Sequence, residues 1–162
     1  MSVTITRMRR RHIEAALAII RAHDKDDAKA AKTYFARKAR SRKRWRATSA
    51  RHYVALDDNM VVGVCGVDKD VEEGVDVWWL GWFYVDASSR GGGVGKALFD
   101  RSVRFARKHG ARKLFVDTGS GKSYRRARDF YAGQGAVEEG RLRDFYGAGD
   151  HMVIYGLALS GK

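Results

Sequence analysis

The sequence predicts one α/β (α+β) domain over residues 1–162, with six or seven strands and about four helices. Three observations support this fold class. The chain has 162 residues, 44% of them hydrophobic, which is enough to bury one sizeable core. Apolar residues recur with the spacing of strands in some stretches and of helices in others. No repeat and no linker divides the chain into separate parts.

The first half of the chain predicts the order strand, helix, helix, strand, strand. Residues 3–7 alternate apolar and polar side chains, which indicates a short strand. Apolar residues within 13–20 follow helical spacing, and the acidic residues within 24–27 are typical of the start of a second helix. Residues 52–56 and 60–67 predict two strands joined by a short polar turn.

The second half predicts strand, helix, strand, and then a helix followed by a hairpin. A glycine-rich turn separates the first strand of this half from a helix that ends near Gly110, a residue typical of helix C-termini. A loop is expected over 118–122 and the hairpin turn over 147–150. The predicted elements are a strand at 75–85, the helix to Gly110, a strand at 113–117, a helix at 123–133, and hairpin strands at 136–146 and 152–159.

The composition excludes several classes of protein. The single cysteine, Cys65, allows no internal disulfide and lies in an apolar run, so we expect it in the core. The five histidines lack metal-ligand spacing, and no metal site is expected. The first residues do not resemble a secretion signal, and no apolar run is long enough to cross a membrane. A cytoplasmic protein without membrane association is therefore expected.

The charge of the chain indicates anionic partners. The formal net charge is +13, and a basic protein attracts polyanions. Residues 37–51 are strongly basic, contain Trp45 and include no acidic residue. Such a run fits a nucleic-acid surface or a preference for acidic or phosphate-bearing substrates. It also fits the more common alternative, a solvated helix end and loop.

The glycine-rich turn carries the clearest functional signal. Backbone N–H groups at the start of the following helix would be exposed at the positive end of its dipole, which is a site for phosphate. The spacing matches neither the mononucleotide P-loop nor the dinucleotide fingerprint. What remains is the pattern Arg90-x-x-Gly93-x-Gly95.

This pattern resembles the acetyl-CoA pyrophosphate loop of the GNAT superfamily of N-acetyltransferases. One helix and one strand later, Ala127-x-x-Phe130-Tyr131-x-x-x-Gly135 is similar to the family's helix that carries a tyrosine beside the cofactor sulfur. The predicted element order also resembles that of the GNAT fold. The resemblance implies a twisted mixed, mainly antiparallel sheet that opens between its fourth and fifth strands.

The resemblance also implies how acetyl-CoA would bind. Arg90 would fix the loop or contact phosphate, and Tyr131 would donate a proton to the departing sulfur. Tyr124 stands where many members carry an asparagine that binds the pantetheine arm. The backbone of the fourth strand would pair with that arm, and the loop amides would hold the pyrophosphate. The residues implied in these two backbone roles are Phe83 and Val85 for the strand, and Gly91, Gly92, Gly93, Val94, Gly95 and Lys96 for the loop.

A base is needed because the accepting amine must be neutral, and a lysine-like amine has a pKa of ~10.4. In some members of the family a glutamate on the fourth strand serves as this base, but Trp79 occupies that position here. Asp76 and Asp117, on or at the ends of the two strands that flank the opening, are the favoured candidates. Glu72 and Glu73 remain as alternatives.

Alternation along the long strand sorts its large side chains into two faces. One face would line an acceptor pocket or belong to the core. The two predicted sets are Trp78, Trp82 and Tyr84 on one face, and Trp79, Phe83 and Val85 on the other.

Together these residues predict an acyltransferase: an acetyl-CoA-dependent N-acetyltransferase that transfers the acetyl group directly to a primary amine of a small molecule or protein. Two alternatives stay open. One is a basic module with a GNAT fold that associates with nucleic acid or the ribosome. The other is a non-catalytic acyl-CoA-binding sensor. A homodimer and a nucleic-acid partner are compatible with the sequence, which decides neither.

Overall fold

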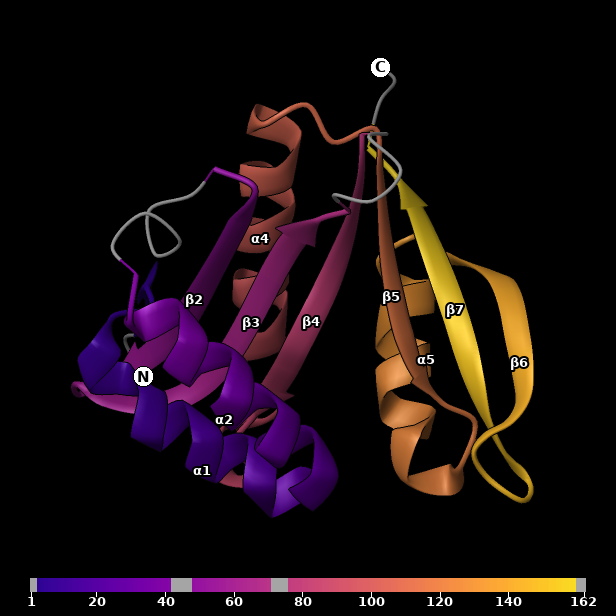
Figure 1. Ribbon diagram of the computed structural model, residues 1–162, viewed down its shortest axis with the longest axis horizontal. Helices are drawn as coiled ribbons and strands as arrows, with labels where there is room; N and C mark the ends of the chain where they lie inside the picture. The colour runs from indigo at the N-terminus through magenta and orange to yellow at the C-terminus, as the bar shows by residue number, and fades with distance from the viewer. Residues whose placement is uncertain (1–2, 42–47, 71–75, 160–162) are drawn as a thin grey trace.

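A computed structural model describes residues 3–41, 48–70 and 76–159. These residues form a mixed, mostly antiparallel sheet of seven strands in the order β1-β2-β3-β4-β5-β7-β6, with helices on both faces (Figure 1). The elements are β1 (Thr4–Arg7), α1 (Ile13–His23), α2 (Lys25–Ala39), β2 (Ala50–Asp57), β3 (Met60–Lys69), β4 (Val77–Val85), α4 (Val94–Lys108), β5 (Lys113–Gly119), α5 (Arg125–Gly133), β6 (Val137–Gly147) and β7 (Asp150–Ala158).

The predicted element order and fold class are confirmed, with two corrections at element ends. Thr118 and Gly119, expected in a loop, extend β5 because β7 continues to pair with them. The hairpin turn is shorter than expected, since Gly147 and Asp150 pair with each other and belong to β6 and β7. Both extensions depend on a partner strand, which local sequence does not reveal.

The helices divide the core into two clusters. Helices α1 and α2 cover one face of the sheet, and α4 and α5 cover the other (Figure 1). On the α1–α2 side, Leu17, Ile20 and Phe35 pack against Val54 and Val64. The prediction for Cys65 is confirmed, because its side chain is fully buried on the α4 side and burial raises the pKa of its thiol to about 12. No helix among the described residues is both long and apolar enough to span a membrane.

A bulge in β4 overturns the faces predicted from simple alternation. Trp82 has a φ of 44°, and the register with β3 shifts between Val64 and Gly66. The extra residue reverses the side-chain direction for the rest of the strand. The side chains therefore group as Trp78, Leu80, Phe83 and Val85 on the α4 side, and Trp82 and Tyr84 on the α1–α2 side.

The sheet opens between β4 and β5, as the family resemblance implies. These two parallel strands pair only over Val77–Trp79 and Lys113–Phe115. Beyond that point β5 pairs with β7 as far as Gly119, while β4 continues beside β3 to Val85. The two halves of the sheet diverge below the paired end in Figure 1. One edge of β4 is thus left without a partner strand in the described chain.

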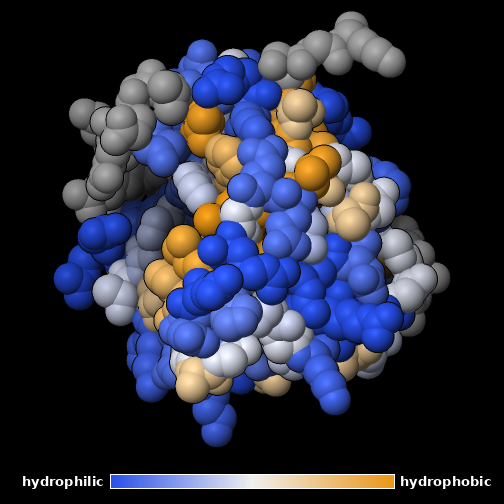
Figure 2. Space-filling view, turned by 90° about the vertical axis from the view of Figure 1, so that its right-hand side faces the viewer, coloured by the Kyte–Doolittle hydropathy of each residue, from blue (hydrophilic) through white to orange (hydrophobic). Residues whose placement is uncertain are grey.

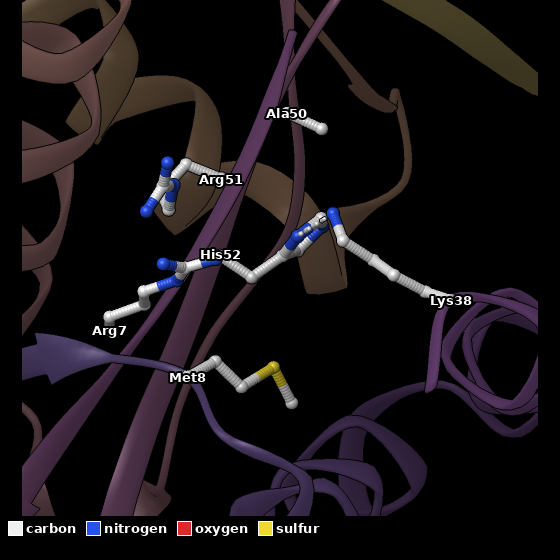
Figure 3. A pocket seen from close by; sticks show the side chains of 6 residues that line it. All are labelled: Arg7, Met8, Lys38, Ala50, Arg51 and His52. Atoms are coloured by element: carbon white, nitrogen blue, oxygen red, sulfur yellow. Dashed lines mark hydrogen bonds between the residues drawn. The ribbon is translucent and has the colours of Figure 1, made fainter. Parts of the chain in front are cut away.

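A buried polar cluster lies near the paired end of the sheet. The Lys38 ammonium is 3.3 Å from the Tyr34 hydroxyl and 3.2 Å from Nδ1 of His52, and Tyr34 donates to Asp68 at 2.6 Å. Figure 3 shows Lys38 and His52 meeting beside a small pocket that Arg7 also lines. Burial lowers the pKa of Lys38 to about 8 and that of His52 well below its ordinary value. The cluster therefore links α2 to β2 and β3 with desolvated polar groups.

Two strand glycines provide a matched test of this packing. A Cβ at Gly66 would overlap the buried His52 ring, whereas a Cβ at Gly81 would meet no atom within 4 Å. Since the ring is held from several sides, we expect Gly66→Ala to lower the free energy of unfolding by about 1–3 kcal/mol. Gly81→Ala should change it by less than about 0.5 kcal/mol. Urea unfolding measures both, and equal effects would contradict the packing described.

The Lys38 site predicts a pH-dependent stability. Burial lowers the pKa of Lys38 from its ordinary 10.5 to about 8 in the folded protein. Between these two pH values the unfolded chain therefore binds more protons than the folded protein does. Stability contributed by this site therefore increases from pH 8 to pH 10 and is lost as the pH falls. Urea unfolding should give a rise in wild type that exceeds that of Lys38→Met by about 1–3 kcal/mol. Lys32→Met, at an exposed position of the same helix, should keep the wild-type slope.

Candidate active site

The glycine loop presents open backbone donors at the start of α4. Gly91 and Gly93 have φ values of 84° and 80°, a conformation that glycine adopts without strain. Gly93 is the N-cap of α4, no side chain caps the helix, and its first turn holds no acidic residue. The Lys96 ammonium lies 2.7 Å from Asp100 on the helix surface. The first-turn amides are therefore free of side-chain caps and fit an anionic group.

Arg90 anchors this loop to the end of β4. Its Nε donates to the carbonyl of Val85 at 3.3 Å, and its Nη2 lies 2.9 and 2.7 Å from the two ring nitrogens of His23. His23 Nε2 is also 3.2 Å from the Val85 carbonyl. Of the two roles predicted for Arg90, this arrangement fits fixing of the loop. The Val85 carbonyl is therefore already in contact with the side chains of Arg90 and His23.

An apolar floor connects the loop to α5. A Cβ at Gly95 would lie 3.5 Å from the Phe83 ring and 3.7 Å from Val85, so loop and strand are in close contact. The Phe83 ring lies 5.4 Å from Phe130 and 6.3 Å from Tyr131 between centroids. The loop, the unpaired part of β4 and α5 thus converge on the α4 side of the opening.

Tyr131 is the buried polar group of this region. Its side chain is on α5, the residue is 5% exposed, and its hydroxyl has no hydrogen-bond partner among the residues the structure describes. Burial raises the pKa of Tyr131, and nearby Cys65 and Asp117 raise it further. The phenol therefore stays protonated across the neutral pH range and can donate a hydrogen bond.

The carboxylates predicted as bases lie in different places. Asp117 is on β5 beyond the segment paired with β4, and it accepts a hydrogen bond from Tyr146 at 2.8 Å. Asp76 precedes β4 at the paired end and forms an ion pair with Lys69 at 3.2 Å. At about 3.3 Å per residue, β4 separates it from the glycine loop by roughly 25 Å. The structure brings Asp117, and not Asp76, to the opening.

Some predicted residues lie outside the described chain. These include Glu72 and Glu73, and the centre of the basic segment around Trp45. Of the segment's described part, Arg51 lies over the Phe105 ring at 4.6 Å.

Tyr124 joins the two halves of the sheet on the α1–α2 side of the opening. Its hydroxyl donates to Asp24 at 2.7 Å, across 100 positions of sequence. Asp24 is also the N-cap of α2 and accepts from the backbone N–H groups of Asp26 and Asp27 at 2.9 Å. Tyr124 therefore makes a side-chain bridge at the position where the family resemblance implies a pantetheine contact.

Asp27, which contacts Tyr84 beside the opening, was not identified as a site residue from the sequence. Tyr84 donates to Asp27 at 2.6 Å, and burial, together with the charges of Asp24 and Asp117, raises the pKa of Asp27. In the sequence, Asp27 is typical of the acidic residues found in the first turn of a helix. Its contact with Tyr84 arises only when α2 packs on the sheet, so no local signal could have identified it.

Other surfaces offer weaker candidates. No group of three or more His, Cys, Asp or Glu suited to a metal ion occurs within the described ranges. The small pocket beside Lys38 and His52 (Figure 3) is lined by residues of β1, α2 and β2 and by Met8, and none of these lining residues belongs to the glycine loop. Figure 2 shows that hydrophilic residues cover much of the face on the β6 side, with hydrophobic ones between them. The exposed Val137, Leu142 and Phe145 belong to β6, which is rich in charged residues. The opening between β4 and β5 is the strongest candidate.

Solved structures share this architecture. A protein of the GNAT family from Desulfovibrio desulfuricans superposes with a TM-score of 0.85 and 22% identity, covering 98% of this chain and 100% of that one. The ribosomal-protein-S18-alanine N-acetyltransferase of Escherichia coli gives a TM-score of 0.75 and 16% identity, covering 99% of this chain and 96% of that one. yncA of Salmonella typhimurium, whose structure contains acetyl-CoA, gives a TM-score of 0.76 and 15% identity. The match covers 100% of this chain and 96% of that one. At these identities the likeness shows the fold.

Family membership follows from the sequence itself. No curated protein matches the chain. The model of the acetyltransferase (GNAT) family, in contrast, matches residues 15–136, about three quarters of the chain, and this match spans α1 through α5. Members of this family use acetyl-CoA. With the glycine loop, the opened sheet and Tyr131 in the arrangement described above, the chain belongs to the acetyltransferase (GNAT) family.

Proposed function

We propose that this protein is an acetyl-CoA-dependent N-acetyltransferase that transfers the acetyl group directly to a primary amine, acting in the cytoplasm. The observation that carries the proposal is the convergence of three features at one opening: the uncapped start of α4, the unpaired edge of β4 and the buried Tyr131. The acceptor amine is that of a small molecule or a protein.

The residues present fit acetyl-CoA. The amides of the loop from Gly91 to Lys96 bind the pyrophosphate, and Arg90 holds the loop in place. The backbone of Phe83 pairs with the pantetheine arm in preference to Val85, whose carbonyl Arg90 and His23 occupy. Bound acetyl-CoA supplies a thioester, whose carbonyl carbon is the electrophile.

Two side chains handle the protons. Asp117, directly or through one water, removes a proton from the ammonium of the acceptor. The freed nitrogen lone pair forms the new N–C bond and the C–S bond breaks. The nitrogen loses a second proton and the sulfur takes one up, so the products are the amide and the CoA thiol. Tyr131 donates a hydrogen bond to that sulfur. Because its raised pKa makes it a weak acid, stabilising the negative sulfur is its main contribution.

The anion site predicts a charge-specific loss of cofactor affinity. Gly92 has an ordinary φ, and a Cβ there would meet only the Ser89 carbonyl, at 3.9 Å. Gly92→Asp places a carboxylate where the pyrophosphate binds, so we expect acetyl-CoA affinity to fall at least tenfold in calorimetry. Without ligand the same variant should be as stable as wild type, since an acidic residue suits a helix N-terminus.

Gly92→Ala is the matched control and should bind acetyl-CoA nearly as wild type does. Acetyl-CoA at 100 times its Kd should stabilise the wild-type protein by about 2.7 kcal/mol. An absence of thermal stabilisation by acetyl-CoA, or equal affinities in Gly92→Asp and Gly92→Ala, would contradict the assigned loop.

Tyr131→Phe tests the hydrogen bond to sulfur. We expect kcat to fall about 10²-fold while the Kd of acetyl-CoA stays within twofold. The free energy of unfolding should change by less than about 0.5 kcal/mol, because the hydroxyl has no partner in the described chain. Release of CoA thiol with an amine acceptor measures kcat. Tyr155→Phe, whose ring lies 6.0 Å from that of Tyr131, should keep wild-type turnover, and equal kcat values in both variants would remove Tyr131 from the mechanism.

A further inference from the structure

The outer surface of α4 carries basic side chains that the proposed function does not use. With 3.6 residues per turn, four exposed residues fall within one arc of about 120° of this helix. They are Arg101, Arg104, Arg107 and Lys108, and together they form the basic face of α4. The helix covers the side of the sheet opposite to α1 and α2 (Figure 1). This face is therefore a surface of its own, on the outside of the molecule.

The charge of the basic face is not neutralised within the described residues. None of its four side chains forms an ion pair there, and the one acidic residue of α4, Asp100, is paired with Lys96 at 2.7 Å. Arg104 is three or four positions from each of the other three, the spacing at which like charges on a helix repel each other. Because this repulsion weakens the free helix, an external anion would relieve it.

The helix dipole accounts for only part of this charge. Cations in the last turn of a helix stabilise it, and Arg107 and Lys108 lie in the last turn of α4. Arg101 and Arg104 lie in the middle of the helix, where the dipole has little effect. These two residues therefore have no role in stabilising the helix end.

Strand β2 extends the basic face with Arg51. The Arg51 guanidinium lies 4.6 Å from the centre of the Phe105 ring, and that of Arg101 lies 5.3 Å from the Tyr53 ring. The two rings are 6.4 Å apart between centroids, so the two arginines belong to one contiguous surface. A guanidinium stacked on a ring keeps its N–H edges available. Nε of Arg51 is buried and has no hydrogen-bond partner in the described chain.

The composition of this surface favours phosphate groups on a duplex. The planar donors of arginine match the oxygens of phosphate. A protein partner would need apolar anchors at the centre of the interface, and a single strand would need exposed rings on which its bases stack. The large hydrophobic side chains that are exposed in the described chain belong to β3 and β6, and none belongs to α4 or β2. A duplex needs neither feature, because its bases are stacked inside and its phosphates are outside.

We propose that the basic face of α4, together with Arg51, binds the phosphate backbone of a nucleic-acid duplex without reading its sequence. The surface is separate from the glycine loop, because a rise of 1.5 Å per residue puts Arg101 roughly 12 Å and Lys108 roughly 22 Å along the helix from Gly93. The proposal goes beyond the proposed function and does not depend on it. Of the basic segment at 37–51, only Arg51 takes part.

The experiment titrates wild-type protein into labelled DNA and RNA duplexes of about 20 base pairs and follows fluorescence anisotropy. We expect a Kd of about 10⁻⁴ M or lower at physiological salt. In the double variant Arg104→Gln/Lys108→Gln the affinity should fall at least tenfold. The salt dependence, as log K against log salt, should become shallower by about 1.8, since each lost phosphate contact accounts for about 0.9. Neither side chain has an ion pair to lose in the described chain, so the fold is retained.

The double variant Lys25→Gln/Lys32→Gln is the matched control. It removes the same charge from exposed positions of α2, on the opposite side of the sheet, and should bind within about twofold of wild type. Equal losses in the two double variants would show that net charge alone attracts the duplex and would overturn the proposal. An absence of binding to both duplexes at about 50 mM salt, where such binding is strong, would also overturn it.

Two further arms separate other partners and the other anion site. Tighter binding to oligothymidylate or to polyglutamate than to either duplex would indicate a single strand or an acidic protein and would overturn the proposal. Saturating acetyl-CoA should leave duplex binding unchanged, whereas displacement would assign the duplex to the glycine loop. Binding of the DNA duplex, the RNA duplex or both, with loss in Arg104→Gln/Lys108→Gln only, would support the proposal and identify the source of the phosphates.

Discussion

The structure depends on a short pairing between two parallel strands. β4 and β5 share a ladder of only three residue pairs, at Val77–Trp79 and Lys113–Phe115, and then follow different partners. A β-bulge at Trp82 increases the local bend of β4, and β7 holds β5 on the other side. The backbone edge that this leaves unpaired is costly in a folded protein, because polar groups require partners. In the proposed function the pantetheine arm satisfies these groups.

The opening separates two kinds of electrostatic environment. On the α4 side are backbone N–H groups at a helix start, which favour anions. Elsewhere at the opening the carboxylates of Asp27 and Asp117 accept hydrogen bonds from Tyr84 and Tyr146. The proposed transfer from a phosphorylated acyl donor to an amine uses an anion site and a carboxylate base. The net charge of +13 does not predict the local electrostatic potential at the opening. That potential depends on which charged and polar groups lie close together there, and not on the total charge of the chain.

Tyrosines connect this electrostatic division to the fold. Tyr84, Tyr124 and Tyr146 each donate to a carboxylate on another element, so α2, the segment before α5, and β6 are positioned relative to the opening. Neutral donors fix the carboxylates without cancelling their charge, which an arginine or lysine partner would do. Of these contacts, the one from Tyr124 to Asp24 crosses the opening and links the two halves of the structure. Stability and the charge of the site therefore share these hydrogen bonds.

The sequence alone determined the features that depend on near neighbours. Helical and strand spacing predicted the element order, the glycine turn before α4 predicted an anion site, and Phe130-Tyr131 at its distance from that turn indicated the family. Only the tertiary structure decided which face Trp82 and Tyr84 occupy, because a one-residue bulge inverts a period of two. The tertiary structure also places Asp76 beside Lys69 at the paired end of the sheet, and it brings Asp27 to Tyr84 across 57 positions of sequence. Such contacts arise from the packing of elements that are distant in sequence, so the spacing of residues along the chain does not predict them.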